Sequence, residues 1–120
     1  MAAARTCVLV VDDDASIRLL CRVNLELRGY AVAEAATLAQ ARAALAGGDV
    51  HAMLLDLALG ADDGLELLHE VDDVPVALLT GGDRTGAGLA VLAKPFGLEE
   101  LVATVERLAG PAVTGRLPTG

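Results

Sequence analysis

Short unbroken runs of apolar residues recur along this chain and alternate with segments of helical periodicity. Unbroken runs are typical of strands buried on both faces of a parallel sheet, because a strand with one face in water alternates apolar and polar residues. The runs occupy residues 7–11, 52–55, 76–79 and 89–93, and a weaker strand is expected at 30–34. The alternation predicts a doubly wound α/β domain with a five-stranded parallel sheet.

The segments between these runs carry the signals of helices. Thr37 is a suitable N-cap for a helix that ends at Gly47-Gly48, and Asp63 is expected to cap the helix after Gly64. The clearest periodicity comes last, with apolar residues at i, i+3, i+4 and i+7. These residues are Leu98, Leu101, Val102, Val105 and Leu108, and Gly110-Pro111 ends the helix.

One connection departs from this pattern. Four glycines fall within residues 81–88, between the fourth and fifth runs, so a stable helix is not expected there. We predict that residues 81–89 are irregular and that the fourth helix is short or absent. The sheet would then be less covered on that side, which makes a homodimer a possible consequence.

Length and charge exclude several classes of protein. The 120 residues fit one domain, 54% are hydrophobic, and the formal net charge is −8. A strongly acidic chain without basic clusters is not expected to bind nucleic acid directly. No apolar stretch approaches a membrane span and no signal peptide is visible, so a cytoplasmic location is expected. The widely separated Cys7 and Cys21 are interpreted as buried apolar residues in a reducing compartment.

Polar residues stand where the predicted strands end. Asp12 and Asp13 follow the first strand, Asp56 ends the third, Thr80 the fourth and Lys94 the fifth. The carboxyl ends of parallel strands share one edge of the sheet, so these side chains are expected to converge. Two carboxylates about 4 Å apart repel by ~4 kcal/mol at an effective dielectric constant near 20. A single lysine would only partly relieve the repulsion among three of them. Mg²⁺ is therefore the expected occupant, and phosphoryl transfer to Asp56 the expected chemistry.

Four motifs in order resemble the receiver domain of response regulators. They are Val-Leu-Val-Val-Asp-Asp-Asp at 8–14, Leu-Leu-Asp-Leu at 54–57 followed by Asp63-Gly64, Val-Pro-Val-Ala-Leu-Leu-Thr at 74–80, and Lys-Pro-Phe at 94–96. The resemblance covers roughly residues 5–109 and leaves 110–120 as a flexible tail or the start of a linker. It implies a flavodoxin-like fold with strand order 2-1-3-4-5.

The same resemblance implies a function. A bacterial histidine kinase or histidine phosphotransfer protein would phosphorylate Asp56 in a two-component or phosphorelay pathway. The domain would not be an enzyme, although it would assist its own phosphorylation and dephosphorylation. Thr80 and Lys94 would contact the phosphoryl group and couple it to conformational change, and the Lys94–Pro95 bond would be cis, with Phe96 as a core anchor.

Mg²⁺ would be bound directly by Asp13, Asp56 and the backbone carbonyl of Ala58. Asp12 would act mainly through water. The sequence departs from the family pattern at three points. Besides the weak fourth helix, Val91 replaces the aromatic residue three before Lys94, and Gly60 replaces the proline four after Asp56. The first two departures suggest an unconventional output. A subset of stand-alone receivers with a poorly formed fourth helix is similar to this chain.

Two other functions are also compatible with the sequence. The weak fourth helix and Val91 would suit an interaction domain of receiver fold that signals without phosphate. Asp12-x-Asp14 formally fits an aspartyl-phosphate phosphatase of the haloacid-dehalogenase type, although the chain is short for the usual cap. Asp14 lies beyond the acid pair of the family and is otherwise not expected to join the site, and no functional role is expected for His51 or His69.

Overall fold

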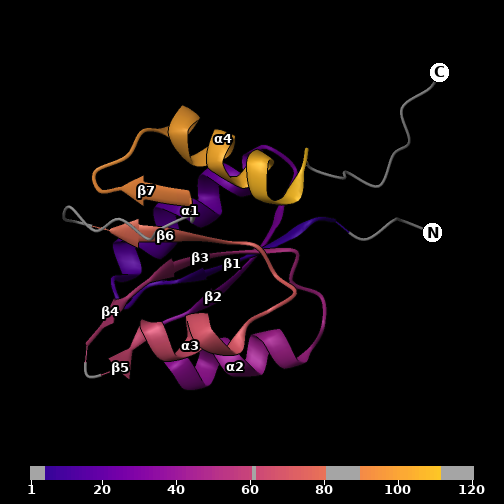
Figure 1. The fold of residues 1–120 in the computed structure, drawn as a ribbon. Helices are drawn as coiled ribbons and strands as arrows, with labels where there is room; N and C mark the ends of the chain where they lie inside the picture. Colours follow the sequence, from indigo (N-terminus) through magenta and orange to yellow (C-terminus); the bar gives the residue numbers. More distant parts are fainter. Residues whose placement is uncertain (1–4, 61, 81–89, 112–120) are drawn as a thin grey trace.

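A five-stranded parallel sheet forms the centre of the molecule. The computed structural model describes residues 5–60, 62–80 and 90–111. The sheet has the order β2-β1-β3-β6-β7, and every neighbouring pair is parallel (Figure 1). Its strands are β1 (Cys7–Val11), β2 (Ala31–Ala35), β3 (Ala52–Asp56), β6 (Val76–Thr80) and β7 (Ala90–Ala93). The predicted sheet and its strand order are confirmed.

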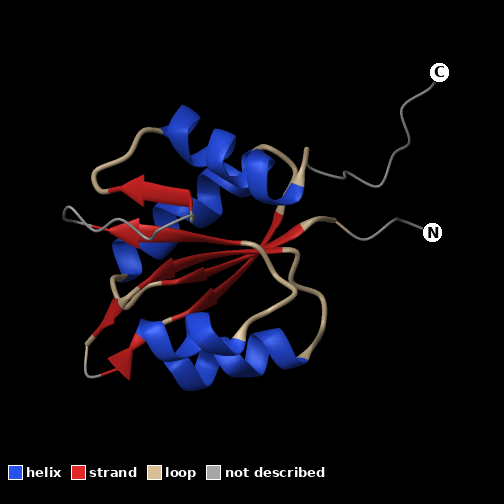
Figure 2. Ribbon diagram, in the orientation of Figure 1, coloured by secondary structure: helices blue, strands red, loops and turns tan. Residues whose placement is uncertain are grey.

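The described residues contain four helices, two on each face of the sheet (Figure 2). Helices α1 (Ala15–Leu27) and α4 (Leu98–Ala109) cover one face. Helices α2 (Leu38–Ala46) and α3 (Gly64–Glu70) cover the other. Two hydrophobic clusters result, and β1 supplies both: Val8 and Val10 pack into one, Leu9 and Val11 into the other. This double burial is why the strands appear as unbroken apolar runs.

Short polar side chains begin three of the helices. The Thr37 hydroxyl accepts a hydrogen bond from the backbone N–H of Gln40 at 3.1 Å, and the Asp63 carboxylate accepts one from Leu65 at 3.0 Å. Both caps are as predicted. At the start of α1, Asp14 plays the same part. Each cap satisfies a backbone donor that has no partner within its own helix.

A small hairpin, which the sequence did not predict, follows β3. Strands β4 (Ala58–Leu59) and β5 (Asp62–Asp63) pair antiparallel between the end of β3 and the start of α3. Two-residue strands are too short to show any periodicity. Gly60 has a φ of 61° in this hairpin, a value that proline cannot adopt and glycine adopts readily.

Several further expectations can be compared with the structure. The Lys94–Pro95 bond is cis, and Phe96 packs against the core. Cys7 is half-buried, Cys21 is buried, and both are free thiols. Across the described residues, no helix is both long and apolar enough to cross a membrane. The predicted irregularity of residues 81–89 and most of the tail at 110–120 lie outside the described residues.

Candidate functional site

Three aspartates meet at the carboxyl edge of the sheet. Asp12 follows β1 directly, Asp13 is the next residue, and Asp56 is the last residue of β3. Each offers a carboxylate oxygen that lies within 4.8 Å of the other two. We call these three residues the acid pocket. The convergence predicted from the strand ends is therefore present for all three.

Lys94 bridges two of the three acids. Its Nζ lies 2.7 Å from Oδ2 of Asp12 and 3.0 Å from Oδ2 of Asp56. Lys94 is the only lysine in the chain and follows β7, at the edge of the sheet. Burial alone would lower the pKa of Lys94, but the hydrogen bonds and charges of Asp12 and Asp56 outweigh it and raise the pKa. The ammonium is therefore held charged between the carboxylates.

Asp12 is the most deeply buried member of the acid pocket. Its exposed fraction is 0%, whereas the side chain of Asp56 is 13% exposed. Burial raises the pKa of Asp12, and the hydrogen bonds from Lys94 and from the Asp14 backbone oppose this effect only in part. A cation bound in the pocket would act in the same direction as these hydrogen bonds and favour the ionised form of Asp12.

Backbone N–H groups orient both bridged carboxylates. Oδ1 of Asp12 accepts a hydrogen bond from the N–H of Asp14 at 2.9 Å, and Oδ1 of Asp56 accepts one from Ala58 at 2.8 Å. In each case the donor is two residues farther along the chain, which is the pattern of an Asx turn. One oxygen of each carboxylate is thus held by the backbone, while the other faces Lys94.

Thr80 lies at the same edge, on the strand beside Asp56. Asp56 pairs with Leu79 in the β3–β6 register, so Thr80 stands one residue farther toward the edge. Thr80 is 8% exposed, and its carbonyl accepts the backbone N–H of Lys94 at 2.6 Å. A main-chain hydrogen bond therefore joins Thr80 to Lys94. The Ala58 carbonyl remains a predicted metal ligand.

Gly64 packs closely against the backbone of Asp56 and Leu57, a contact that the sequence did not reveal. A Cβ at this position would lie 2.6 Å from the carbonyl oxygen of Asp56 and 2.8 Å from Cα of Leu57. The Gly64 N–H also donates to the carbonyl of Leu57 at 2.9 Å. The start of α3 can therefore pack against the end of β3 only because residue 64 has no side chain.

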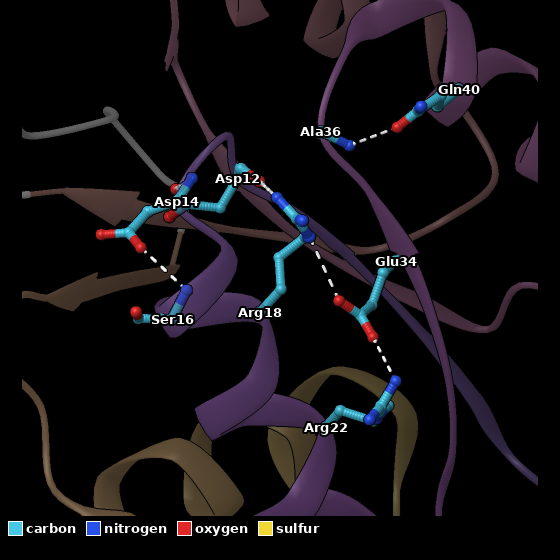
Figure 3. A network of polar contacts seen from close by, with 8 residues as sticks. All are labelled: Asp12, Asp14, Ser16, Arg18, Arg22, Glu34, Ala36 and Gln40. Carbon is cyan, nitrogen blue, oxygen red and sulfur yellow. Dashed lines mark hydrogen bonds and ion pairs between the residues drawn. The ribbon is translucent and has the colours of Figure 1, made fainter.

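Other polar residues lie apart from the acid pocket. The carboxylate of Asp14 accepts the N–H of Ser16 at 2.8 Å and caps α1 (Figure 3). His51 accepts the N–H of Cys7 at the start of β1, at the opposite edge of the sheet, and His69 is exposed in the last turn of α3. Val91 pairs with Leu78 and packs against the α2–α3 face.

The acid pocket suits a hard divalent cation. Its donors are carboxylate oxygens from three residues, one exposed, one part-buried and one buried. Carboxylates with room for water are the ligand set that Mg²⁺ prefers. The lysine beside them offsets one of the three negative charges, which leaves a net attraction for a cation.

Comparison with known proteins agrees with this geometry. A family model described as the response regulator receiver domain matches residues 8–106. Response regulator MprA of Mycobacterium sp. (strain KMS) is 36% identical over 84% of this chain and 49% of its own length. The MprA of Mycobacterium tuberculosis (strain ATCC 25177 / H37Ra) gives the same values. The chain thus spans about half the length of the curated relatives it matches.

Solved structures show the same fold. The chemotaxis protein CheY4 of Vibrio cholerae is 26% identical, with a TM-score of 0.77 over 88% of this chain and 99% of that one. The receiver domain of NtrX from Brucella abortus is 28% identical, with a TM-score of 0.78 over 85% and 97%. A response regulator from Burkholderia pseudomallei, solved with a phosphorylated aspartic acid and a calcium ion, is 31% identical, with a TM-score of 0.71 over 82% and 65%. The chain belongs to the response regulator receiver domain family.

Proposed function

We propose that this domain is a phosphoacceptor of a two-component or phosphorelay pathway and that Asp56 carries the phosphoryl group. The donor would be the phosphohistidine of a histidine kinase or a histidine phosphotransfer protein. The observation that carries the proposal is the acid pocket, in which Lys94 bridges Asp12 and Asp56. A carboxylate beside a fixed cation and a metal site matches the needs of phosphoryl transfer.

The transfer would proceed at Oδ2 of Asp56, the oxygen that faces Lys94 and is not held by the backbone N–H of Ala58. That oxygen attacks phosphorus and forms an acyl phosphate, while the P–N bond of the donor breaks and the imidazole leaves with the electron pair and takes up a proton. Lys94, 3.0 Å from Asp56 Oδ2, would pair with a phosphoryl oxygen, and the Thr80 hydroxyl would hydrogen-bond to another. Mg²⁺, when bound, would neutralise the charge of the phosphoryl oxygens.

The proposed metal ligands are those that the family resemblance implies. Asp13 and Asp56 would bind Mg²⁺ directly together with the Ala58 carbonyl, and the buried Asp12 would act mainly through water. In this reading the domain is not an enzyme with a separate substrate. It assists its own phosphorylation and dephosphorylation.

Exposure favours Asp56 over Asp12 as the acceptor. A donor phosphohistidine must reach the attacking oxygen, and Asp12 is 0% exposed while the Asp56 side chain is 13% exposed. The phosphatase alternative would need Asp12 as nucleophile and Asp14 as general acid. Asp14 caps α1 through Ser16, which weighs against that use. Hydrolysis of p-nitrophenyl phosphate with turnover would instead support the alternative.

Incubation with acetyl phosphate tests the proposal. Intact-mass spectrometry should show one added phosphate in the presence of Mg²⁺ and much less with EDTA. Asp56→Asn, which keeps the size of the side chain, should show none. If no adduct forms even with a cognate kinase, the chain is better described as an interaction domain that signals without phosphate.

The proposed function also implies a cellular location, a class of partner and domain bounds. We propose a cytoplasmic location in a bacterium, protein partners with no direct nucleic-acid contact, and a homodimer as a possible assembly. We also propose residues 5–109 as the receiver domain and 110–120 as a tail or linker. The excess of acidic residues supports partners other than nucleic acid.

A further inference from the structure

An ion-pair network lies beside the acid pocket, on the α1 side of the sheet (Figure 3). Nε of Arg18 lies 3.1 Å from Oε1 of Glu34, and Nη1 of Arg22 lies 2.8 Å from Oε2 of the same residue. Both arginines belong to α1, and Glu34 belongs to β2. One carboxylate of an edge strand thus holds two consecutive turns of the helix.

Arg18 makes a second contact that Arg22 does not share. Its Nη1 donates a hydrogen bond to the backbone carbonyl of Asp12 at 2.7 Å. Asp12 is the first residue beyond β1, and its N–H still donates to the carbonyl of Ala35 at 3.0 Å. The Arg18 side chain is only 17% exposed, whereas that of Arg22 is 43% exposed. Arg18 is therefore held from two directions.

The carbonyl that Arg18 holds belongs to the peptide group between Asp12 and Asp13. A peptide group is planar, so a hydrogen bond to its oxygen restrains the whole group, and with it the ψ angle of Asp12 and the φ angle of Asp13. Both belong to the acid pocket. We infer that Arg18 is a positioning residue for the metal site, which holds the Asp12–Asp13 peptide so that both carboxylates face the same cation. This inference rests on the proposed function.

Charge and geometry make opposite predictions for the loss of Arg18. A nearby positive charge repels a cation, so removing it would strengthen Mg²⁺ binding if only charge mattered. Loss of a group that orients ligands weakens metal binding, typically by 10–100-fold for outer-shell partners. Arg18 orients the main chain and not a ligand atom, so we expect the lower end, about tenfold.

Arg22 offers a matched control. Arg18→Met and Arg22→Met each remove one positive charge and one ion pair to Glu34, and only Arg18→Met also frees the Asp12 carbonyl. Arg18→Lys keeps the charge but lacks the planar fork that reaches two acceptors at once. It serves as a milder variant if Arg18→Met folds poorly. Urea unfolding in EDTA reports the stability of each variant.

Titration calorimetry of the full chain with MgCl₂ measures the effect. We expect the Kd for Mg²⁺ to rise about tenfold in Arg18→Met and to rise in Arg18→Lys, with Arg22→Met unchanged or tighter. The inference would be overturned by equal Kd values for the folded Arg18 variants and the wild type, or by an equal weakening of Mg²⁺ binding in Arg22→Met. Neither result would contradict the proposed function. A wild-type protein that binds no Mg²⁺ and gains no phosphate would contradict the proposed function, and the inference with it.

Discussion

Lys94 contacts Asp12 and Asp56, so it neutralises a buried carboxylate and also lies at the proposed site of phosphoryl transfer. Asp12 has no exposed surface, and its carboxylate accepts hydrogen bonds from Lys94 and from the N–H of Asp14. A buried carboxylate that loses its cation is costly, because neither water nor another charge replaces it. The same lysine would also compete with the Mg²⁺ that we propose for the acid pocket. Its removal should therefore act in opposite directions on the apo and metal-bound states.

Lys94→Met tests this dual role. In EDTA we expect the free energy of unfolding to fall by about 1–3 kcal/mol, because Asp12 is left buried without its cation. Mg²⁺ should stabilise the variant more than it stabilises the wild type, since the pocket then holds three acids and no competing lysine. Urea unfolding with EDTA and with Mg²⁺ measures both effects, and Arg107→Met provides a control that removes an exposed cation. Equal stabilisation of both proteins by Mg²⁺ would contradict the competition.

At the scale of the element, the end of β3 and the start of α3 are in unusually close contact. Gly64 lies so near Asp56 and Leu57 that a methyl group would meet backbone atoms, which cannot rotate away as a side chain can. Gly47, at the end of α2, has only Ala44 O within ordinary contact distance of such a methyl group, at 3.4 Å, and its φ is −69°. The two glycines differ in their surroundings and not in their chemistry.

Gly64→Ala and Gly47→Ala therefore form a matched pair. Gly64→Ala should lower the free energy of unfolding by about 1–3 kcal/mol, the usual cost of overpacking, and should slow phosphorylation because Asp56 must shift. Gly47→Ala should be neutral or slightly stabilising, because alanine tolerates a helical φ and restricts the unfolded chain. Urea unfolding compares the two. A Gly64→Ala protein as stable as the wild type would mean that α3 can move away without cost.

The sequence predicted the elements that leave a local signal. The five strands appeared because each is buried on both faces, and Thr37 and Asp63 were identified as caps because short polar side chains are common there. The β4–β5 hairpin was missed because two-residue strands have no period. Asp12, Asp13, Asp56 and Lys94 were found because strand ends meet at one edge. Arg18 was not found, because an arginine on the polar side of a helix has the same local sequence whatever it contacts.

At the scale of the whole molecule, the two free thiols report on global folding. Cys21 is fully buried in the hydrophobic cluster that contains Val8 and Val10, under α1 and α4. Burial raises its pKa to about 12. Burial, with the charge of Asp49, also raises the pKa of the half-buried Cys7. The thiolate is the reactive form. Both cysteines should thus be poor nucleophiles while the protein is folded.

Labelling with Ellman's reagent at pH 8 tests this expectation. A thiol with a pKa of about 12 is ionised in roughly one molecule in ten thousand at that pH. In Cys7→Ser, which leaves Cys21 as the reporter, labelling of the native protein should be no faster than global unfolding, and denaturant should make it immediate. Rapid labelling under native conditions would show that the α1–α4 side opens without global unfolding.

The proposed phosphoacceptor, Asp56, can be identified chemically. After treatment with acetyl phosphate and Mg²⁺, borohydride reduces an aspartyl phosphate to homoserine, and peptide mass spectrometry locates the converted residue. The account predicts homoserine at position 56, in a Mg²⁺-dependent amount, and none in Asp56→Asn. Conversion at Asp12 or Asp13, or none at any position, would contradict it.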